Sequence, residues 1–306
     1  MALTLSQLRA FTAVAEHGSI RAASRALGIA QSGITQQLQN LESMLGATLF
    51  TRTNRGIALT ALGQRLLQRA GAIIGECERA EQDVQQLRGD YVGEVTLGMS
   101  TEPLIDAFAP VLMEFRQRFE RVAVHLRVGT SRMMISRIRE GTLDFAAALV
   151  SKHTDTTDLS VTPLYASDPV IVCRQGHPKA GARTLAELAD CPWIATRSPN
   201  LTDDPQVNRL SHLFESHGLR PPNIIATVEG LYESLHLVGA TDCLSLESSV
   251  VVKRGPFATT LTSINVRERA LEQDVCVLQR AAVPLTPAAQ ELAAMIASYA
   301  RAVRAR

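Results

Sequence analysis

Polar side chains that can read nucleic-acid bases recur along one short segment, residues 31–43. Ser32, Gln36, Gln39 and Ser43 fall on one face of an α-helix at about 100° per residue, and Thr35 lies on its flank. Glutamine can pair with adenine edges in the major groove, and hydroxyl groups can pair with several bases. An isolated helix more often carries such a face only because it is solvated, so the interpretation depends on the surrounding elements.

Two arginines follow in "LFTRTNRGIALT", residues 49–60. Apolar residues flank an Asn-Arg-Gly turn there, a pattern that predicts a short β-hairpin with Arg52 and Arg55 at its tip. Such cations can contact phosphates or enter the minor groove. Residues 1–69 hold seven arginines against two glutamates, a formal charge of +5, whereas the whole chain carries only +1. The sequence therefore predicts a basic head that contacts the DNA backbone.

Three helices must position this polar face. Apolar residues spaced three or four apart predict a helix over 4–16, and Ser19 can cap a second helix that ends before the flexible Gly28. A third helix follows, whose apolar stripe is expected to face the core through residue 45; the stripe is Ile34, Leu38, Leu41 and Leu45. Two helices joined by a tight glycine turn are typical of a helix-turn-helix. The polar face then becomes the recognition surface, with Gln31, Ser32, Thr35, Gln36 and Gln39 as candidates.

A heptad pattern follows the hairpin. Steps of four and three residues link Leu66, Ala70, Ile73, Cys77, Ala80, Val84 and Leu87. Polar and acidic residues surround this stripe, so we expect it to pair with the same helix of a second copy, with Leu66, Ile73, Cys77, Val84 and Leu87 at the contact. A dimer would present two recognition helices to two DNA half-sites.

From Glu94 onward, β-branched runs alternate with helical patterns, which predicts a mostly parallel sheet with helices on its faces. Small molecules bind such sheets beyond the carboxyl ends of strands, where helix amino termini attract anions. The candidate residues at three such ends are Ser100, Thr101, Thr130, Ser131, Arg197 and Ser198. Each hydroxyl taken alone is more often a helix cap. Arg197 is the expected partner of a carboxylate or sulfonate.

Several classes of protein are disfavoured by the composition. The chain has five cysteines, an odd number, and no two have CxxC spacing. Both facts argue against a disulfide framework and against a zinc site. The amino terminus lacks a secretion signal and no apolar run approaches a membrane span, so we expect a cytoplasmic protein. There is no GxSxG, Walker or dinucleotide motif, and His212 and His217 do not share a helix face. We therefore expect no catalytic residue, no metal and no cofactor.

The chain resembles the LysR-type transcriptional regulators. The resemblance covers residues 4–65 and rests on Ala23, Leu27, Gly28, Gln31, Ser32, Ile34, Leu38, Leu41, Glu42, Leu49, Phe50, Arg52, Arg55, Leu59, Thr60 and Gly63. It implies a winged helix-turn-helix at residues 1–60, a linker helix at 61–88 and an effector-binding domain at 89–306. It also implies double-stranded promoter DNA and RNA polymerase as partners, and a homotetramer built from dimers.

By the same resemblance, the effector domain is an α/β fold of two Rossmann-like lobes, similar to periplasmic binding proteins, with a ligand cleft between them. We expect lobe I at about 93–162 and 268–306 and lobe II at about 163–267, with the division near Pro163 and Arg267. The stretch "GATDCLSLES", residues 239–248, departs from the family's glycine-rich turn and strand ending in proline. The pocket wall beside it therefore cannot be inferred from relatives.

Two other functions stay open at this point. One is a thiol-based redox-sensing regulator of the same family, although Cys173, Cys191 and Cys243 lack close pairing in the sequence. The other is an architectural DNA-binding protein that needs no ligand, against which the long α/β unit argues. The favoured hypothesis is a sequence-specific DNA-binding regulator that a small anionic effector controls.

Overall fold

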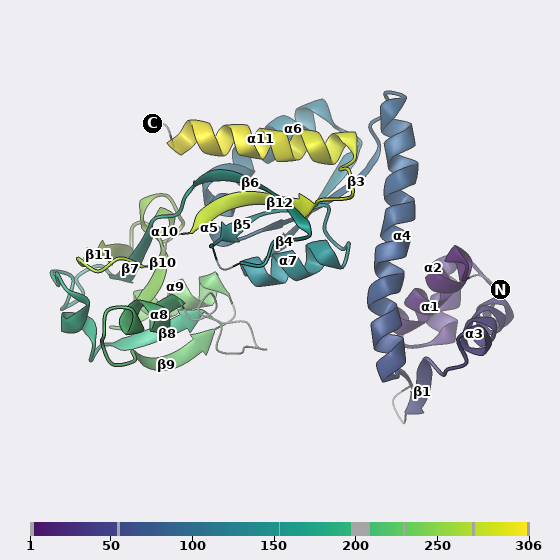
Figure 1. Cartoon of the computed structure of the whole chain (residues 1–306), viewed down its shortest axis with the longest axis horizontal. Helices are drawn as coiled ribbons and strands as arrows, with labels where there is room; N and C mark the ends of the chain where they lie inside the picture. The colour runs from purple at the N-terminus through teal and green to yellow at the C-terminus, as the bar shows by residue number, and fades with distance from the viewer. Residues whose placement is uncertain are drawn as a thin grey trace. The chain divides into compact units, whose positions relative to one another are not determined.

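The computed structural model describes residues 3–53, 56–152, 154–196, 209–228, 230–270 and 273–304, and Figure 1 shows the order of their elements along the chain. The chain divides into two compact units. The first holds residues 1–92 and 136–143, and the second holds 93–135 and 144–306.

The head of the first unit contains three helices and a hairpin. The helices are α1 (Leu5–His17), α2 (Ile20–Leu27) and α3 (Gln31–Leu45), and β1 (Phe50–Thr53) pairs with β2 (Gly56–Leu59) in antiparallel register. Ser19 caps α2 by accepting a hydrogen bond from the Ala22 N–H, and Gly28 ends it with φ 66°, in the left-handed region that favours glycine. The predicted helix-turn-helix and hairpin are therefore confirmed.

The core of the head follows the predicted apolar stripes with one exception. Leu8, Phe11, Ile34 and Leu41 are fully buried together. Leu45, expected to continue the stripe of α3, is 43% exposed. This expectation was wrong because α3 ends at Leu45. Gly46, with φ 62°, turns the chain there, so the Leu45 side chain does not pack in the core.

One long helix, α4 (Ala61–Leu87), completes the first unit. Thr60 caps it by accepting from the Gly63 N–H. A Cβ on Gly63 would lie 2.2 Å from the carbonyl oxygen of Leu49, so only glycine lets this helix approach the hairpin so closely.

Lobe I of the second unit is built on a five-stranded sheet. Its order is β4-β3-β5-β12-β6, with β3 (Gly93–Met99), β4 (Val122–Val128) and β5 (Phe145–Val150) parallel and β12 (Asp274–Arg280) antiparallel to both β5 and β6 (Leu159–Ala166). Figure 1 shows α6 (Ala109–Arg118) and α11 (Pro287–Arg304) on one face and α7 (Ser131–Arg139) on the other. Between β3 and β4, α5 (Thr101–Pro103) and the π-helical turn η1 (Leu104–Phe108) lead directly into α6.

Lobe II contains two smaller sheets. In one, β7 (Pro169–Arg174) pairs antiparallel with β10 (Ser245–Ser248) and β11 (Leu261–Ile264); in the other, β8 (Pro192–Thr196) lies parallel to β9 (Asn223–Val228). The helical segments of this lobe are η2 (Leu185–Leu188), α8 (Arg209–Glu215), α9 (Leu231–Ala240) and α10 (Val250–Lys253). The expectation of a mostly parallel sheet was wrong, because antiparallel pairs join both β12 and β7 to their neighbours.

The chain crosses between the lobes later than expected. Pro163 lies within β6 and pairs with Cys276 in lobe I, and the Arg267 N–H donates to Arg183 O within lobe II. The two crossing segments meet instead where the Ser167 N–H donates to Gln273 O at 2.8 Å. Proline at position 163 is tolerated because β6 is an edge strand of its sheet.

None of the helices in the described ranges is long and apolar enough to cross a membrane.

Candidate functional sites: a nucleic-acid-reading helix and an inter-lobe polar cluster

The outer face of α3 carries the predicted reading residues. Gln31, Ser32, Gln36 and Gln39 are exposed, and Thr35 is partly buried on the flank. Thr35 Oγ1 donates to Gln31 O at 2.8 Å, and Gln36 Nε2 donates to Asn40 Oδ1 at 2.9 Å. Four of the five candidates of this helix are therefore exposed, and Thr35 lies on their flank.

The hairpin is tied to the same helix by Glu42. Its Oε1 accepts from the Leu49 N–H at 2.6 Å and from the Phe50 N–H at 3.3 Å. A carboxylate that receives two backbone donors makes strong, charge-assisted bonds, so α3 and β1 are held in a defined relation. The side chain of Arg52 and the whole of Arg55 lie outside the described residues.

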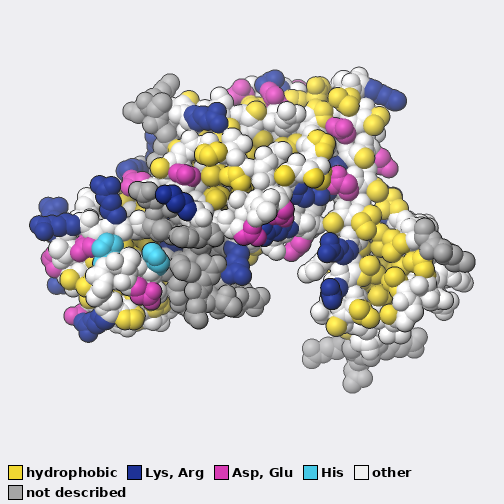
Figure 2. Space-filling model, in the orientation of Figure 1, with side chains coloured by type: hydrophobic (Ala, Val, Ile, Leu, Met, Phe, Trp, Pro, Cys, Tyr) yellow, Lys and Arg dark blue, Asp and Glu magenta, His cyan; other side chains and the backbone are white. Residues whose placement is uncertain are grey.

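The predicted dimer stripe of α4 divides into two parts. Ala70 is buried and Leu66 packs against the head core. Ile73, Val84 and Leu87 are 44%, 52% and 73% exposed, and Cys77 is partly buried. Figure 2 shows hydrophobic side chains gathered over α4 and the helices of the head. Exposed apolar side chains in a row on one helix leave a surface that a second helix could cover.

The predicted effector residues lie at the carboxyl ends of neighbouring strands. Ser100 follows β3 and Thr130 precedes α7 after β4; because β3 and β4 are parallel, both lie at one edge of the sheet. Thr130 Oγ1 accepts from the Met133 N–H at 3.4 Å and so acts as a helix cap. Thr101 and Ser131 are partly buried beside them. Arg197 and Ser198 lie outside the described residues.

Three charged residues that the sequence reasoning missed meet near this edge. Glu102, in α5 of lobe I, is 1% exposed, and its Oε2 accepts from Ser167 Oγ at 2.6 Å. Arg209 begins α8 and Glu247 lies in β10, both in lobe II and both partly buried. Arg209 interacts electrostatically with both carboxyl groups. The cluster therefore joins the two lobes.

A signal for Arg209 was present in the sequence. Arg209, Leu213 and the neighbouring Leu210 and Phe214 share the helical spacing of one inward stripe, and the three apolar residues are buried. A charged residue on an otherwise apolar face is the kind of position that marks a site. Glu247 lies in residues 239–248, which depart from the family pattern, but no local pattern there indicates that its side chain is partly buried.

Burial is the largest cause of the pKa shifts of Glu247 and Arg209. Desolvation raises the pKa of Glu247 to about 7, against the attraction of Arg209 and the hydrogen bonds from Thr196 and Ser234. These two bonds are long, 3.3 Å from Thr196 Oγ1 and 3.4 Å from Ser234 Oγ, and both reach Oε1. Desolvation likewise lowers the pKa of Arg209, although a guanidinium stays protonated at neutral pH.

Several buried polar atoms around the cluster lack a hydrogen-bond partner within the described residues. They are Nε and Nη2 of Arg209, the hydroxyls of Ser100, Ser245 and Ser248, and Oε1 of Gln273. Each such atom costs about 1–3 kcal/mol when nothing bonds to it. A concentration of them at the junction of two lobes is typical of a site that a ligand completes.

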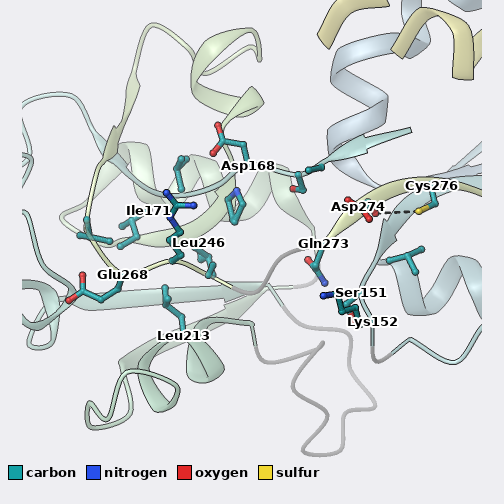
Figure 3. A pocket seen from close by; sticks show the side chains of 18 of the residues that line it. Ser151, Lys152, Asp168, Ile171, Leu213, Leu246, Glu268, Gln273, Asp274 and Cys276 are labelled. Carbon is teal, nitrogen blue, oxygen red and sulfur yellow. Dashed lines mark hydrogen bonds between the residues drawn. The ribbon is translucent and has the colours of Figure 1, made fainter. Parts of the chain in front are cut away.

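An open cleft of about 780 Å³ runs along this junction. Its lining includes Ser167, whose hydroxyl donates to Glu102, and Gln273. Leu213 of α8 and Leu246 of β10 also line it, whereas Arg209 and Glu247 on the same two elements are not among the lining residues. In Figure 3, the Gln273 side chain points toward Ser151 and Lys152. The volume suits a small metabolite.

Three of the five cysteines are buried, and Cys77 and Cys191 are partly buried. Cys173, Cys243 and Cys276 are buried, and burial raises the pKa of Cys173 and of Cys276 to about 11. A raised pKa suppresses the reactive thiolate. Within the described ranges, no group of three His, Cys, Asp or Glu side chains could hold a metal ion.

Comparison with known proteins matches both parts of the chain. Residues 5–64 match the family described as "Bacterial regulatory helix-turn-helix protein, lysR family", and residues 88–301 match "LysR substrate binding domain". The SDS degradation transcriptional activation protein of a Pseudomonas species is 30% identical over 298 residues, covering 95% of each chain.

Two solved structures share the fold. CbnR, described as a LysR family transcriptional regulator, has a TM-score of 0.69 at 20% identity, covering 98% of this chain and 99% of that one. Full-length OxyR from Pseudomonas aeruginosa has a TM-score of 0.67 at 14% identity, covering 98% and 95% of the two chains.

Proposed function

Because the chain belongs to the LysR family of transcriptional regulators, we propose that it binds operator DNA sequence-specifically under the control of a small effector with an anionic group. The observation that carries the proposal is the presence, on one chain, of an exposed base-reading helix and, between the two lobes, of a cleft together with buried polar atoms that lack partners among the described residues. The first surface fits DNA and the second fits a small molecule.

The head supports the DNA-binding part. Glutamine and serine side chains of α3 are exposed where base edges would meet them. The hairpin is fixed to α3 through Glu42, so arginines of the hairpin would contact the backbone while α3 enters the major groove. Arg52 and Arg55 remain the proposed backbone contacts.

The linker helix supports assembly into dimers. Pairing of two α4 helices would bury Ile73, Val84 and Leu87, which are exposed in the single chain. Two paired heads would then address two half-sites. Further association of dimers into a tetramer, and contact with RNA polymerase, are part of the same proposal.

The second unit supports control by an effector. A small molecule that contacts Glu102 and Ser100 from lobe I and Arg209 from lobe II would favour one spacing of the lobes over another. Ser100, Thr101, Thr130, Ser131, Arg197 and Ser198 are the proposed contacts that the sequence indicated. A carboxylate or sulfonate fits a guanidinium fork. The proposal includes no catalytic step and no cofactor.

Two measurements test this function on the full chain. First, enrichment of genomic fragments should yield a preferred operator, and Arg55→Ala should weaken binding to all duplexes and lower the salt slope by about 1. Second, a thermal-shift screen of aliphatic and aromatic acids should find a compound that raises Tm, and Arg197→Ala should abolish its effect while operator binding persists. No preference over random duplex would contradict the DNA part, and no stabilising acid would contradict the effector part.

A thiol switch would show a different pattern. Its operator affinity would change with dithiothreitol, whereas regulation by a small anion leaves it unchanged. The raised pKa of Cys173 and of Cys276 argues against a reactive thiolate at those positions.

A further inference from the structure

The unpartnered atoms of Arg209 form a particular surface. Nε–H and Nη2–H lie side by side on one edge of the guanidinium, and both are buried without an acceptor among the described residues. This edge is the one on which a carboxylate makes two parallel, charge-assisted hydrogen bonds. Glu247 and Glu102 interact with Arg209 electrostatically, but neither bonds to these two atoms. A carboxylate from outside the chain would complete them.

Glu247, in contrast to Arg209, needs a hydrogen-bond donor from a ligand. Its Oε1 receives the two long bonds from Thr196 and Ser234, and no hydrogen bond within the described residues reaches its Oε2. The Oε1 atom of Gln273, on the cleft wall, is also buried without a donor. The Gln273 oxygen and an ionised Glu247 carboxylate only accept hydrogen bonds. A ligand that completes them must donate hydrogen bonds.

The net charge of the site favours one class of ligand over another. Two carboxyl groups face one guanidinium, so the cluster carries an excess of negative charge when both are ionised. A simple monoanion would add a second uncompensated charge to a partly desolvated site, which is costly. A zwitterion adds none, and its ammonium group brings three donors.

We propose that the effector is a free amino acid, whose carboxylate binds the Nε and Nη2 edge of Arg209 and whose ammonium group donates to Glu247. This inference rests on the proposed function and specifies its ligand. The ligand touches lobe II through Arg209 and Glu247, and the Glu102 side chain of lobe I lies against the same cluster. Binding therefore changes the electrostatic attraction between the two lobes.

A thermal-shift and calorimetric comparison of matched compounds on the full-length chain tests this. The probes are the common amino acids, each beside the same acid without its amino group, such as alanine with propionate and glutamate with glutarate. We expect at least one amino acid to raise Tm by about 5 °C at roughly 100 times its Kd. Its deaminated partner should bind about 10-fold or more weakly, because the acceptors are left unpaired.

Variants separate the two halves of the ligand. Glu247→Gln should weaken the amino acid about 10-fold or more without weakening its deaminated partner, whereas Arg209→Met should weaken both. The control Glu215→Gln removes an exposed carboxyl group from the same helix as Arg209 and should change neither. Circular dichroism and operator affinity check that each variant is folded.

The possible outcomes distinguish failure of the amino-acid ligand from failure of the proposed function. Acids that bind as tightly as amino acids, or a Glu247→Gln variant with unchanged amino-acid affinity, would overturn the zwitterion and leave the regulator with an anionic effector. If neither set of compounds binds, the zwitterion and the anionic effector fail together, and the operator measurement still stands by itself.

Discussion

The reading face of α3 and the inter-lobe cluster are both polar, yet they are built in opposite ways. On α3 the side chains are exposed, and Thr35 and Gln36 bond to groups one turn away in the same helix. In the cluster, the Glu102 carboxyl group and two atoms of the Arg209 side chain are buried, and the latter lack hydrogen bonds within the described residues. The first surface is complete without a partner, whereas the second is not.

This difference teaches where stability and function compete. An exposed glutamine costs the fold almost nothing, so the head can change its DNA preference freely. A partly buried carboxyl group whose pKa is raised to about 7 is destabilising when ionised. Side chains that reduce stability and lack a structural partner are expected where a ligand supplies the missing contacts.

The largest expected effect concerns the pairing of heads. Changing both Ile73 and Val84 to aspartate places charges on the exposed apolar stripe of α4, so two copies should no longer associate. Operator affinity should then fall about 100-fold or more, since a single head loses the gain from binding two half-sites together. Analytical ultracentrifugation and operator titration measure the two effects.

Gln85→Asp serves as the matched control, because Gln85 is exposed and points about 100° away from Val84 on the same helix. It should leave both the assembly and the operator affinity intact. A double variant that stays dimeric would show that the second copy binds elsewhere.

The second largest expected effect is on the stability of the second unit, when the carboxyl group of Glu247 is removed. In the unfolded chain Glu247 titrates near 4.5, and in the folded chain its pKa is about 7. The carboxyl group is neutral in both states below the lower value, and its ionisation destabilises the fold increasingly as pH rises through this window. Glu247→Gln should therefore raise the free energy of unfolding by about 3 kcal/mol at about pH 8 and have little effect below about pH 4.5.

Denaturant unfolding at the two pH values gives this difference directly. The exposed Glu215→Gln variant should show no such dependence on pH. A Glu247→Gln chain that is less stable than its parent at pH 8 would mean that the carboxylate is structural and not held for a ligand.

The smallest effect is in the head. Gln36→Ala removes an exposed amide from the reading face and should cost about 1–2 kcal/mol of discrimination at one base pair. Non-specific affinity and the free energy of unfolding should stay within about 0.5 kcal/mol of the parent. Competition between operator and single-base variants, together with thermal unfolding, measures both quantities, and a loss of stability would break the contrast between the two regions.

Much of the head could be predicted because its signals are local. The stripe of Ile34, Leu38 and Leu41, the Ser19 cap and the Gly28 turn all act within one or two helical turns. The error at Leu45 arose at a helix end, where a single left-handed residue removes a side chain from its stripe. The antiparallel strands of the second unit were harder to foresee, because β5 and β12 pair across more than a hundred residues.

The sequence by itself determined the helix-turn-helix, its polar face and the apolar seam of the linker, since helical period places these residues by spacing alone. Only the tertiary structure decided that Glu102, Arg209 and Glu247 meet between two lobes. Desolvation depends on neighbours that arrive from distant segments, so a glutamate destined for burial has no local pattern that separates it from one on the surface.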